Sequence, residues 1–376
     1  MEKKKIRVLV VEDSMLFRKM LIDRLSELDN IEVVGYAIDA FDAEQKILKL
    51  TPDVVTLDVE LPKMSGIEFL KKFLPTYSVP VVMVSALNIS VFDALSSGAV
   101  DFVRKPGMTE NNIDNFIRDL STKIYIASMA RVRTKLQTQP TAPTALGQNG
   151  AAPRVTGSTV PPPAARAPIQ TKPIPPIGTV KDSALNNSMI IALGASTGGT
   201  EATLAVLKDL PANIPPIVVV QHMPAGFTDM YAQRLNRLCN MNVKEAKTGD
   251  KLTKGNVYVA PGDFQLKVQK IGSDFVIKCF EAEKVSGHRP SVDVMFESVA
   301  ECAGSNAVGI IMTGMGQDGA KGLLSMRKKG AYTIGQDKDS CVVYGMPMVA
   351  FNIGGVTTQA ACEDISRVLL KHLNTR

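Results

Sequence analysis

The chain has 376 residues, of which 45% are hydrophobic and 5% aromatic, and it contains no tryptophan. This length suits two folded domains with cores built from aliphatic side chains. The net charge of +6 arises largely between residues 131 and 187, where Lys and Arg outnumber the acids by seven to one. Neither flanking part is basic enough for a nucleic-acid-binding surface, which argues against a DNA-binding output domain.

Cysteines and apolar runs indicate the cellular compartment. The five cysteines are odd in number and contain no CxxC pair, which is typical of small buried side chains in a reducing compartment. The apolar run near the start is too short for a signal sequence, and no run is long enough to span a membrane. We therefore expect a cytoplasmic protein without membrane insertion.

Residues 1–125 alternate short apolar runs with amphipathic stretches. This alternation predicts an α/β domain, a doubly wound parallel sheet of five strands covered by helices on both faces. The strands are expected at 6–13, 31–37, 53–59, 80–86 and 99–106. The helices are expected at 14–28, 40–50, 66–74, 90–97 and 111–131.

Polar side chains follow four of these strands. Glu12 and Asp13 end the first strand, Asp58 the third, Ser85 the fourth and Lys105 the fifth. The carboxyl ends of parallel strands meet at one edge of a sheet, so three acids should crowd beside a lysine. A hard divalent cation such as Mg²⁺ relieves repulsion between carboxylates and can steer a phosphoryl group onto one of them.

Each of these side chains also has a structural interpretation. Asp13 or Ser14 can cap the following helix, Asp58 can belong to a turn, and Lys105 can be a solvated charge. Matching chemistry at four strand ends favours a site over these separate explanations.

The domain resembles the receiver domain of two-component response regulators over essentially all of residues 1–125. The resemblance implies phosphorylation at Asp58, a Mg²⁺ ion held by Glu12, Asp13 and Asp58, phosphoryl contacts from Ser85 and Lys105, and an aromatic switch at Phe102.

Residues 126–185 separate this domain from the rest of the chain. They include the end of a helix and, from Gln137 to about Thr179, a stretch rich in Pro, Ala, Thr and Gly. Proline fixes φ and removes hydrogen-bond donors, and few large apolar side chains are present to be buried. The segment is predicted to be a semi-extended, disordered tether.

Residues 186–376 predict a second α/β domain, with a mostly parallel sheet and one β-hairpin. Strands are expected at 189–195, 215–221, 257–261, 307–314 and 331–337, and the hairpin at 266–272 and 275–281. Helices are expected to follow Gly199, Phe227, Ser291 and Gly319, and a last helix should contain His372.

Three of these strands end in the members of a nucleophilic triad, namely Ser196, His222 and Asp318. Small residues around Ser196 allow a sharp turn that exposes its hydroxyl. A nucleotide-phosphate loop is disfavoured because no Gly-Lys-Ser/Thr follows, and a plain helix cap remains the structural alternative. The pattern indicates a serine hydrolase.

The general base is chosen from three histidines. His222 follows an unbroken apolar strand and should lie beside the Ser196 turn, so it is the better base. His288 lies in a polar loop, where it could contact substrate or form loop hydrogen bonds. His372 lies among charged residues in the last helix and is expected to be solvated.

The orienting acid has two candidates. Asp263 follows a strand but lies in Pro-Gly-Asp, a common turn sequence. Asp318 ends a glycine-rich loop that permits close backbone approach, and we favour it. The order Ser, His, Asp differs from the Ser, Asp, His order of α/β-hydrolases.

The second domain is similar to the catalytic domain of the chemotaxis protein-glutamate methylesterases. The motifs that carry this resemblance are GASTGG, QHMPAGFT, APGD, GHRPSVDVMFESVA, TGMGQDGAKG and DSCVVYGMP. The resemblance implies hydrolysis of glutamate methyl esters on methyl-accepting chemoreceptors and deamidation of certain receptor glutamines. It also implies a histidine kinase as phosphodonor, supports the triad without a catalytic metal, and places Thr197 and Met315 near the oxyanion.

The two domains carry opposite charge, −3 over residues 1–130 and +3 over residues 188–376. A flexible tether between them allows reversible docking. We expect the first domain to cover the Ser196 edge until phosphorylation releases it.

Overall fold

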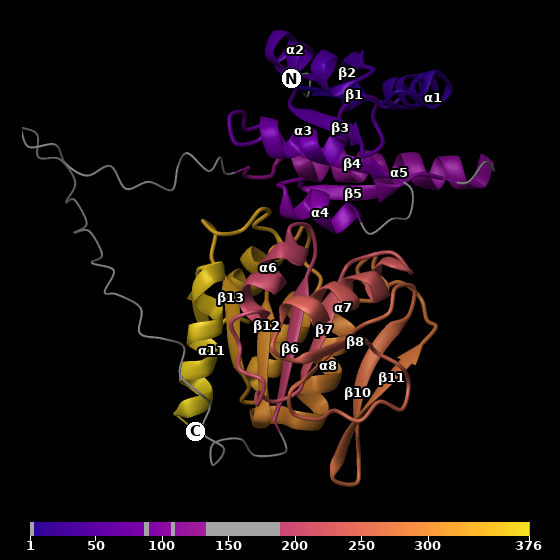
Figure 1. Cartoon of the computed structure of the whole chain (residues 1–376). Helices are drawn as coiled ribbons and strands as arrows, with labels where there is room; N and C mark the ends of the chain where they lie inside the picture. Colours follow the sequence, from indigo (N-terminus) through magenta and orange to yellow (C-terminus); the bar gives the residue numbers. More distant parts are fainter. Residues whose placement is uncertain (1–3, 86–89, 107–109, 133–188, 376) are drawn as a thin grey trace, which may run out of the picture.

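The computed structural model describes residues 4–85, 90–106, 110–132 and 189–375 (Figure 1). The predicted tether at 137–179 lies outside the described residues. Two α/β domains are stacked, with the amino-terminal domain above the carboxy-terminal one in Figure 1. In the described part of the chain, no helix is long and apolar enough to cross a membrane.

The first domain contains the expected five-stranded parallel sheet, in the order β2-β1-β3-β4-β5. Alternate side chains of β1 enter opposite cores: Leu9 and Val11 pack on one face, and Val8 and Val10 on the other. Its strands are β1 (Ile6–Val11), β2 (Ile31–Ala37), β3 (Val54–Asp58), β4 (Val81–Ser85) and β5 (Asp101–Arg104), and its helices are α1 (Met15–Ser26), α2 (Ala40–Leu50), α3 (Gly66–Phe73), α4 (Ser90–Ser96) and α5 (Glu110–Ser128).

The second domain contains a parallel sheet in the order β14-β13-β12-β6-β7-β9-β8 and a separate antiparallel hairpin, β10-β11. The strands are β6 (Ile190–Ala195), β7 (Ile217–Gln221), β8 (Asn242–Glu245), β9 (Asn256–Val259), β10 (Gln265–Ile271), β11 (Asp274–Phe280), β12 (Ala307–Ile311), β13 (Tyr332–Gln336) and β14 (Thr358–Ala360). The α-helices are α6 (Gly199–Leu207), α7 (Phe227–Leu238), α8 (Val292–Ala303), α9 (Ala320–Lys328), α10 (Met346–Asn352) and α11 (Ile365–Asn374). The expected strands, hairpin and helices are confirmed, whereas β8, β14 and α10 were not predicted.

The strand order creates a switch point at the centre of this sheet. The chain passes from β6 to β7 on one side, and β12 lies on the other side of β6. Every residue of these three strands is buried. In open α/β sheets a crevice forms outside the carboxyl ends of the strands at such a point.

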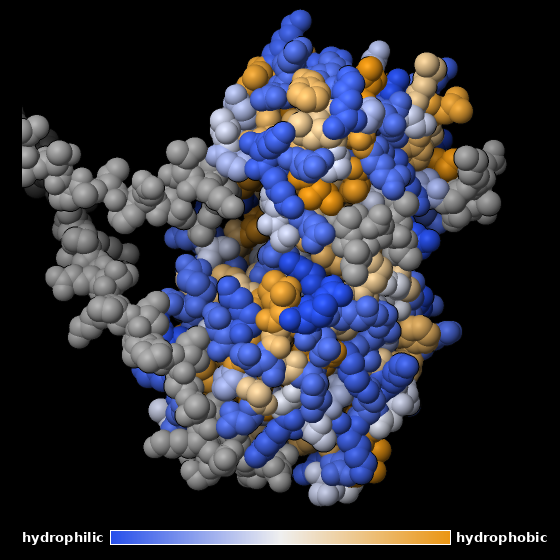
Figure 2. All heavy atoms as spheres, viewed as in Figure 1, coloured by the Kyte–Doolittle hydropathy of each residue, from blue (hydrophilic) through white to orange (hydrophobic). Residues whose placement is uncertain are grey.

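The first domain sits on this carboxyl edge. The Thr197 hydroxyl donates a buried 2.6 Å hydrogen bond to Asp101 Oδ2 at the start of β5. The rings of Phe102 and Phe227 lie 4.6 Å apart, and α4 contacts α6 (Figure 1). On the face shown in Figure 2, hydrophobic residues gather on either side of the junction between the domains. The junction therefore combines apolar packing with polar contacts, among them the buried bond between Thr197 and Asp101.

The five cysteines are free. Cys341 is buried, whereas the other four are half-buried, so the expectation of buried cysteines is correct for one of them. Burial raises the pKa of Cys239, Cys279 and Cys302 to about 11 and that of Cys341 to about 12. These four thiols therefore stay protonated near neutral pH.

Candidate active site and phosphorylation site

Ser196 lies in the turn between β6 and α6, and three hydrogen bonds fix its backbone. The Ser196 amide donates to Thr313 O at 3.0 Å, while Gly199 N and Gln221 Nε2 donate to the Ser196 carbonyl at 2.7 and 2.8 Å. Gly198 has φ of 77°, a conformation that glycine adopts without strain. The turn is thus rigidly tied to the two neighbouring strands of the sheet.

His222 follows β7 and pairs with Asp318. Its Nε2 lies 2.8 Å from Asp318 Oδ2, and both side chains are nearly fully buried. Its Nδ1 is buried and has no hydrogen-bond partner among the described residues. Ser196 lines the same cleft, so Nδ1 is the ring atom left for the serine hydroxyl.

Asp318 lies in the loop between β12 and α9. Its carboxylate contacts the amino terminus of α8, where several donors converge on it. Ser291 Oγ donates at 2.8 Å, and the amides of Val292 and Asp293 donate at 2.7 and 3.1 Å. Burial acts to raise the pKa of Asp318, but the bonds from His222, Val292 and Ser291 hold it below its ordinary value. The acid is therefore ionised at neutral pH, as a residue orienting a histidine must be.

Asp263 lies on the same cleft in a left-handed conformation, with φ of 64°. Within the described residues it forms no hydrogen bond to His222. The geometry thus favours Asp318 as the partner of the ring, and the role of either acid in catalysis is taken up below as a proposal.

His288 occupies a position that the sequence did not indicate. Its ring stacks on His222, with centroids 3.6 Å apart and an angle of 10° between the planes. Its backbone pairs with Val285 in both directions. Burial and the neighbouring His222 lower the pKa of His288 to about 4, so it covers the base as a neutral ring at pH 7.

His372 lies far from the triad in the chain and in the fold. It stacks on Tyr332, with centroids 4.0 Å apart, and is half-buried. The expectation that His372 is solvated is therefore wrong, because an aromatic neighbour on β13 covers its ring.

The two near-site residues differ in their surroundings. Thr197 is buried, its hydroxyl is bonded to Asp101, and its carbonyl accepts a 3.0 Å bond from Thr313 Oγ1. Met315 is half-buried and lines the cleft. Gly314 precedes Met315, and a Cβ at this position would fall 2.6 Å from Ser196 Cβ. Only glycine therefore lets this loop approach the Ser196 turn.

The cleft over the triad has a volume of about 680 Å³. Ser196, His222 and Met315 line one side of it, and side chains of the first domain line the other, among them Phe102 and Lys123. Burial acts to lower the pKa of Lys123, but Asp101 and Asp119 raise it above its ordinary value. The lysine is therefore charged, and both its 3.0 Å contacts go to the carboxylate that binds Thr197.

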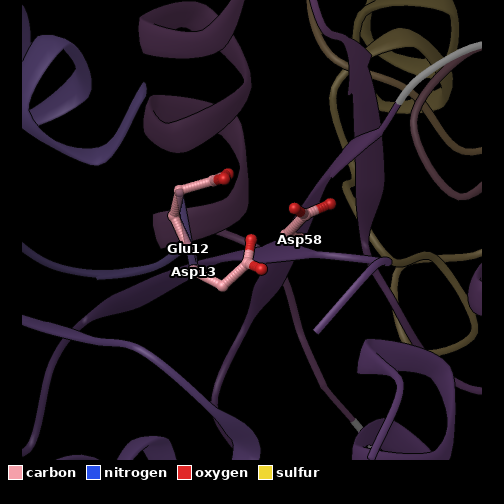
Figure 3. Close-up of side chains that lie close together, drawn as sticks. All are labelled: Glu12, Asp13 and Asp58. Atoms are coloured by element: carbon pink, nitrogen blue, oxygen red, sulfur yellow. The ribbon is translucent and has the colours of Figure 1, made fainter. Parts of the chain in front are cut away.

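The second site lies at the carboxyl edge of the first sheet. Glu12, Asp13 and Asp58 gather at this edge, and one carboxylate oxygen from each lies within 4.8 Å of the other two (Figure 3). Lys105 Nζ lies 2.6 Å from Asp58 Oδ2 and 3.1 Å from Glu12 Oε2. Ser85 is buried at the end of β4, and its carbonyl accepts the Lys105 amide.

These residues fit a hard divalent cation. Burial raises the pKa of Asp58, and burial together with Asp58 raises that of Glu12, although Lys105 opposes both shifts. A single lysine thus leaves excess negative charge among three carboxylates, and oxygen ligands of this kind suit Mg²⁺. The acidic cluster is of the type that binds Mg²⁺ in receiver domains.

Comparison with known proteins covers both domains. A family model described as CheB methylesterase matches residues 191–369, and one described as response regulator receiver domain matches residues 8–118. The crystal structure of the Thermotoga maritima CheB methylesterase catalytic domain has 37% sequence identity and a TM-score of 0.48, covering 49% of this chain and 98% of that chain.

Curated relatives match over the full length. The protein-glutamate methylesterase/protein-glutamine glutaminase 2 of Syntrophomonas wolfei is 46% identical over 375 residues, which cover 100% of this chain and 99% of the relative. The protein-glutamate methylesterase/protein-glutamine glutaminase of Nitrosomonas europaea is 43% identical over 375 residues, which cover 98% of this chain and 97% of the relative. The chain therefore belongs to the CheB family of protein-glutamate methylesterases/protein-glutamine glutaminases, chemotaxis response regulators in which a receiver domain precedes the methylesterase domain.

Proposed function

We propose that Ser196, His222 and Asp318 form the catalytic triad through which this chain hydrolyses glutamyl methyl esters and glutamine side chains of chemoreceptors. The observation that carries the proposal is the buried 2.8 Å contact between His222 Nε2 and Asp318 Oδ2, beside the Ser196 turn. A nucleophile, a base and an orienting acid on neighbouring strand ends are the parts that acyl transfer requires.

The reaction proceeds in two halves. Ser196 Oγ attacks the γ-carbonyl carbon of the side chain while His222 Nδ1 takes the hydroxyl proton. The tetrahedral intermediate collapses, and the same proton leaves with methanol from an ester or with ammonia from an amide. Water then attacks the acyl-enzyme, with His222 as base, and frees a glutamate and the Ser196 hydroxyl.

The negative oxygen of the intermediate needs donors, and the amides of Thr197 and Met315 are the candidates. Neither forms a hydrogen bond with another described residue. Gly314 lets the Met315 loop approach Ser196 closely, which supports the choice of these two amides. A donor of this kind contributes about 3 kcal/mol to transition-state stabilisation.

Asp58 is the proposed phosphoacceptor, and a histidine kinase is the proposed phosphodonor. Mg²⁺ held by Glu12, Asp13 and Asp58 would neutralise the charge that gathers as a phosphoryl group reaches Asp58 Oδ1 or Oδ2. Lys105 contacts Asp58, and Ser85 lies at the next strand end, where both could bind the transferred group. We propose that the protein acts in the cytoplasm, and its five free cysteines, which are typical of a reducing compartment, support this proposal.

Control by phosphorylation is supported by the way the receiver covers the cleft. Phe102, at the proposed switch position, packs on Phe227 of the methylesterase domain, and Asp101 binds Thr197. Movement of Phe102 after phosphorylation would remove one of these contacts. The receiver would then act as a lid that phosphorylation loosens. The gain in activity would be limited by how strongly phosphorylation favours the open state over the closed state.

The test is methanol release from receptor membranes that carry methylated glutamates. Purified wild-type protein with a small phosphodonor and Mg²⁺ should release methanol, and Ser196→Ala should not. The hydrogen bonds described for Ser196 use its backbone nitrogen and oxygen, which alanine keeps, so folding should be unchanged. Methanol release near the wild-type rate by folded Ser196→Ala protein would refute the triad.

A further inference from the structure

A second groove opens beside the triad cleft. It has a volume of about 830 Å³ and shares Met315 and Gly316 with the cleft that holds Ser196. Its walls are largely apolar and come from the loop before α10 and from α10 itself, through Val342, Tyr344 and Met348. Met348 is 41% exposed, which is high for a large apolar side chain in a folded domain. We name this feature the α10 groove.

The floor of the α10 groove is fixed to the same backbone that shapes the Ser196 turn. Val343 N donates to Thr313 Oγ1 at 3.0 Å, and Gly345 N and Met346 N donate to Gly314 O at 3.1 and 2.8 Å. Thr313 O in turn accepts the Ser196 amide. A polypeptide held in the groove is therefore held at a fixed distance from the nucleophile.

The segment that immediately follows α5, here called the end of α5, borders this groove. Met129 and Arg131 line it, and Arg131 N donates a 3.0 Å hydrogen bond to Val342 O. Val342 also packs against the receiver core, next to Ala130 and Val132. The groove thus borders a non-helical segment of the receiver through an apolar side chain and one main-chain bond, contacts that another polypeptide segment could make.

The Arg131 side chain adds little to this contact. It lies 3.2 Å from Asp339, but the two side chains are 52% and 88% exposed. Exposed pairs of this kind contribute about 0 to 1 kcal/mol. Apolar contact in the groove is therefore the main interaction between the end of α5 and the methylesterase domain.

From these contacts we infer that the α10 groove is the docking site for the substrate polypeptide, and that the end of α5 holds the same groove in the inhibited state. The inference rests on the proposed function. A glutamyl side chain that reaches Ser196 leaves its backbone at the rim of the cleft, and the groove begins at Met315 and Gly316 on that rim.

Two substitutions in the groove should have opposite effects on the full-length, unphosphorylated protein. Met129→Glu places a charge on the receiver side of the groove and should displace the end of α5, while the methylesterase side is unchanged, so hydrolysis of methylated receptor membranes should rise at least threefold. Met348→Glu places a charge in the wall itself, so hydrolysis of the same membranes should fall at least tenfold, both with and without a small phosphodonor. Phe351→Glu is the matched control, since Phe351 is 49% exposed on α10 but does not line the groove.

A small soluble ester, p-nitrophenyl acetate, separates docking from chemistry. For Met348→Glu, the ratio of kcat/KM for receptor membranes to kcat/KM for the small ester should fall at least tenfold relative to wild type, and for Phe351→Glu it should change less than twofold. An unchanged ratio for Met348→Glu, or equal losses on both substrates, would overturn the docking site. Inactivity of the wild type on both substrates would instead overturn the proposed function.

Discussion

Asp318 differs from Asp263 in the donors that hold its carboxylate. Ser291 Oγ and two amides of α8 donate to Asp318, which leaves one oxygen edge for His222. Asparagine at this position would present an amide N–H to a donor or to the ring and so favour the wrong imidazole tautomer. We expect Asp318→Asn to lower kcat by about 10⁴-fold and Asp263→Asn to change it little. Methanol release by the two variants, measured side by side, decides between them, and a larger loss for Asp263→Asn would reverse the assignment.

Asp58 is the acid of its cluster that lies at the end of the central strand β3. It is buried, and its closest partner is Lys105, whereas Asp13 is exposed. Wild-type protein treated with radiolabelled acetyl phosphate and Mg²⁺ should take up one acid-stable, base-labile phosphoryl group, and Asp58→Asn should take up none. Asp13→Asn, with its carboxylate among the proposed ligands, should label more slowly than wild type. Labelling of Asp58→Asn at the wild-type level would move the phosphoacceptor to another residue.

At the scale of elements, the start of α8 concentrates negative charge in a small buried volume. Asp293 is 5% exposed, accepts a 2.7 Å bond from Gly322 N, and lies beside Asp318. Burial raises the pKa of Asp293 to about 6 from an ordinary value of 3.8, with repulsion from Asp318 as a further cause. The folded protein thus binds a proton on Asp293 more tightly than the unfolded chain does. The stability that the protonated carboxyl contributes is present below about pH 4 and is lost as the pH rises through 6.

Asp293→Asn should remove the loss of stability that occurs as Asp293 ionises. The amide oxygen can still accept the Gly322 bond, and no charge has to be buried. The free energy of unfolding should rise by on the order of 2 kcal/mol at pH 7.5 and be nearly unchanged at pH 4. Urea unfolding of both proteins at the two pH values measures the difference. An equal change at both pH values would mean that packing rather than ionisation determines the effect.

Elements with their own sequence pattern were predicted, and elements that depend on neighbours were not. β6 is a run of apolar residues that is buried throughout, and its pattern alone indicates a strand. β8 and β14 are short edge strands of four and three residues, which acquire strand structure by pairing with β9 and β13. α10 has one polar residue among seven, so its sequence shows no amphipathic pattern.

The candidate site divides in the same way. Ser196, His222 and Asp318 could be selected because each follows a buried strand. The hydrogen bonds that link Thr313 and Asp101 to Thr197 could not be predicted from the sequence, because they join positions 116 and 96 residues apart. The stacking of His288 on His222 likewise depends on how a polar loop folds over the sheet edge.

For the whole molecule, the junction between the domains uses the same residues that serve the two sites. Phe102 lies on β5, which also ends near Lys105 and hence near Asp58, and it packs on Phe227 at the start of α7. Thr197 lies next to the proposed nucleophile and binds Asp101 on the same strand. A change at the proposed phosphoacceptor Asp58 would therefore need only one short strand to reach the proposed triad, without a long chain of intermediate contacts.

The contact between Asp101 and Thr197 gives the last prediction. A buried hydrogen bond to a charged acceptor contributes about 1.5 to 3 kcal/mol, so Asp101→Ala should shift docking toward the open state by roughly tenfold or more. Methanol release by the unphosphorylated protein should rise by up to about tenfold, while release by the phosphorylated protein should change less than twofold, because its lid is already loosened. Asp23→Ala, at an exposed position on α1, serves as the control, and labelling at Asp58 verifies that the receiver of each variant is folded. If unphosphorylated Asp101→Ala is no faster than wild type although its receiver is labelled normally, the contact does not hold the lid closed, and the receiver would have to control the enzyme through the apolar contacts of Phe102 and the end of α5.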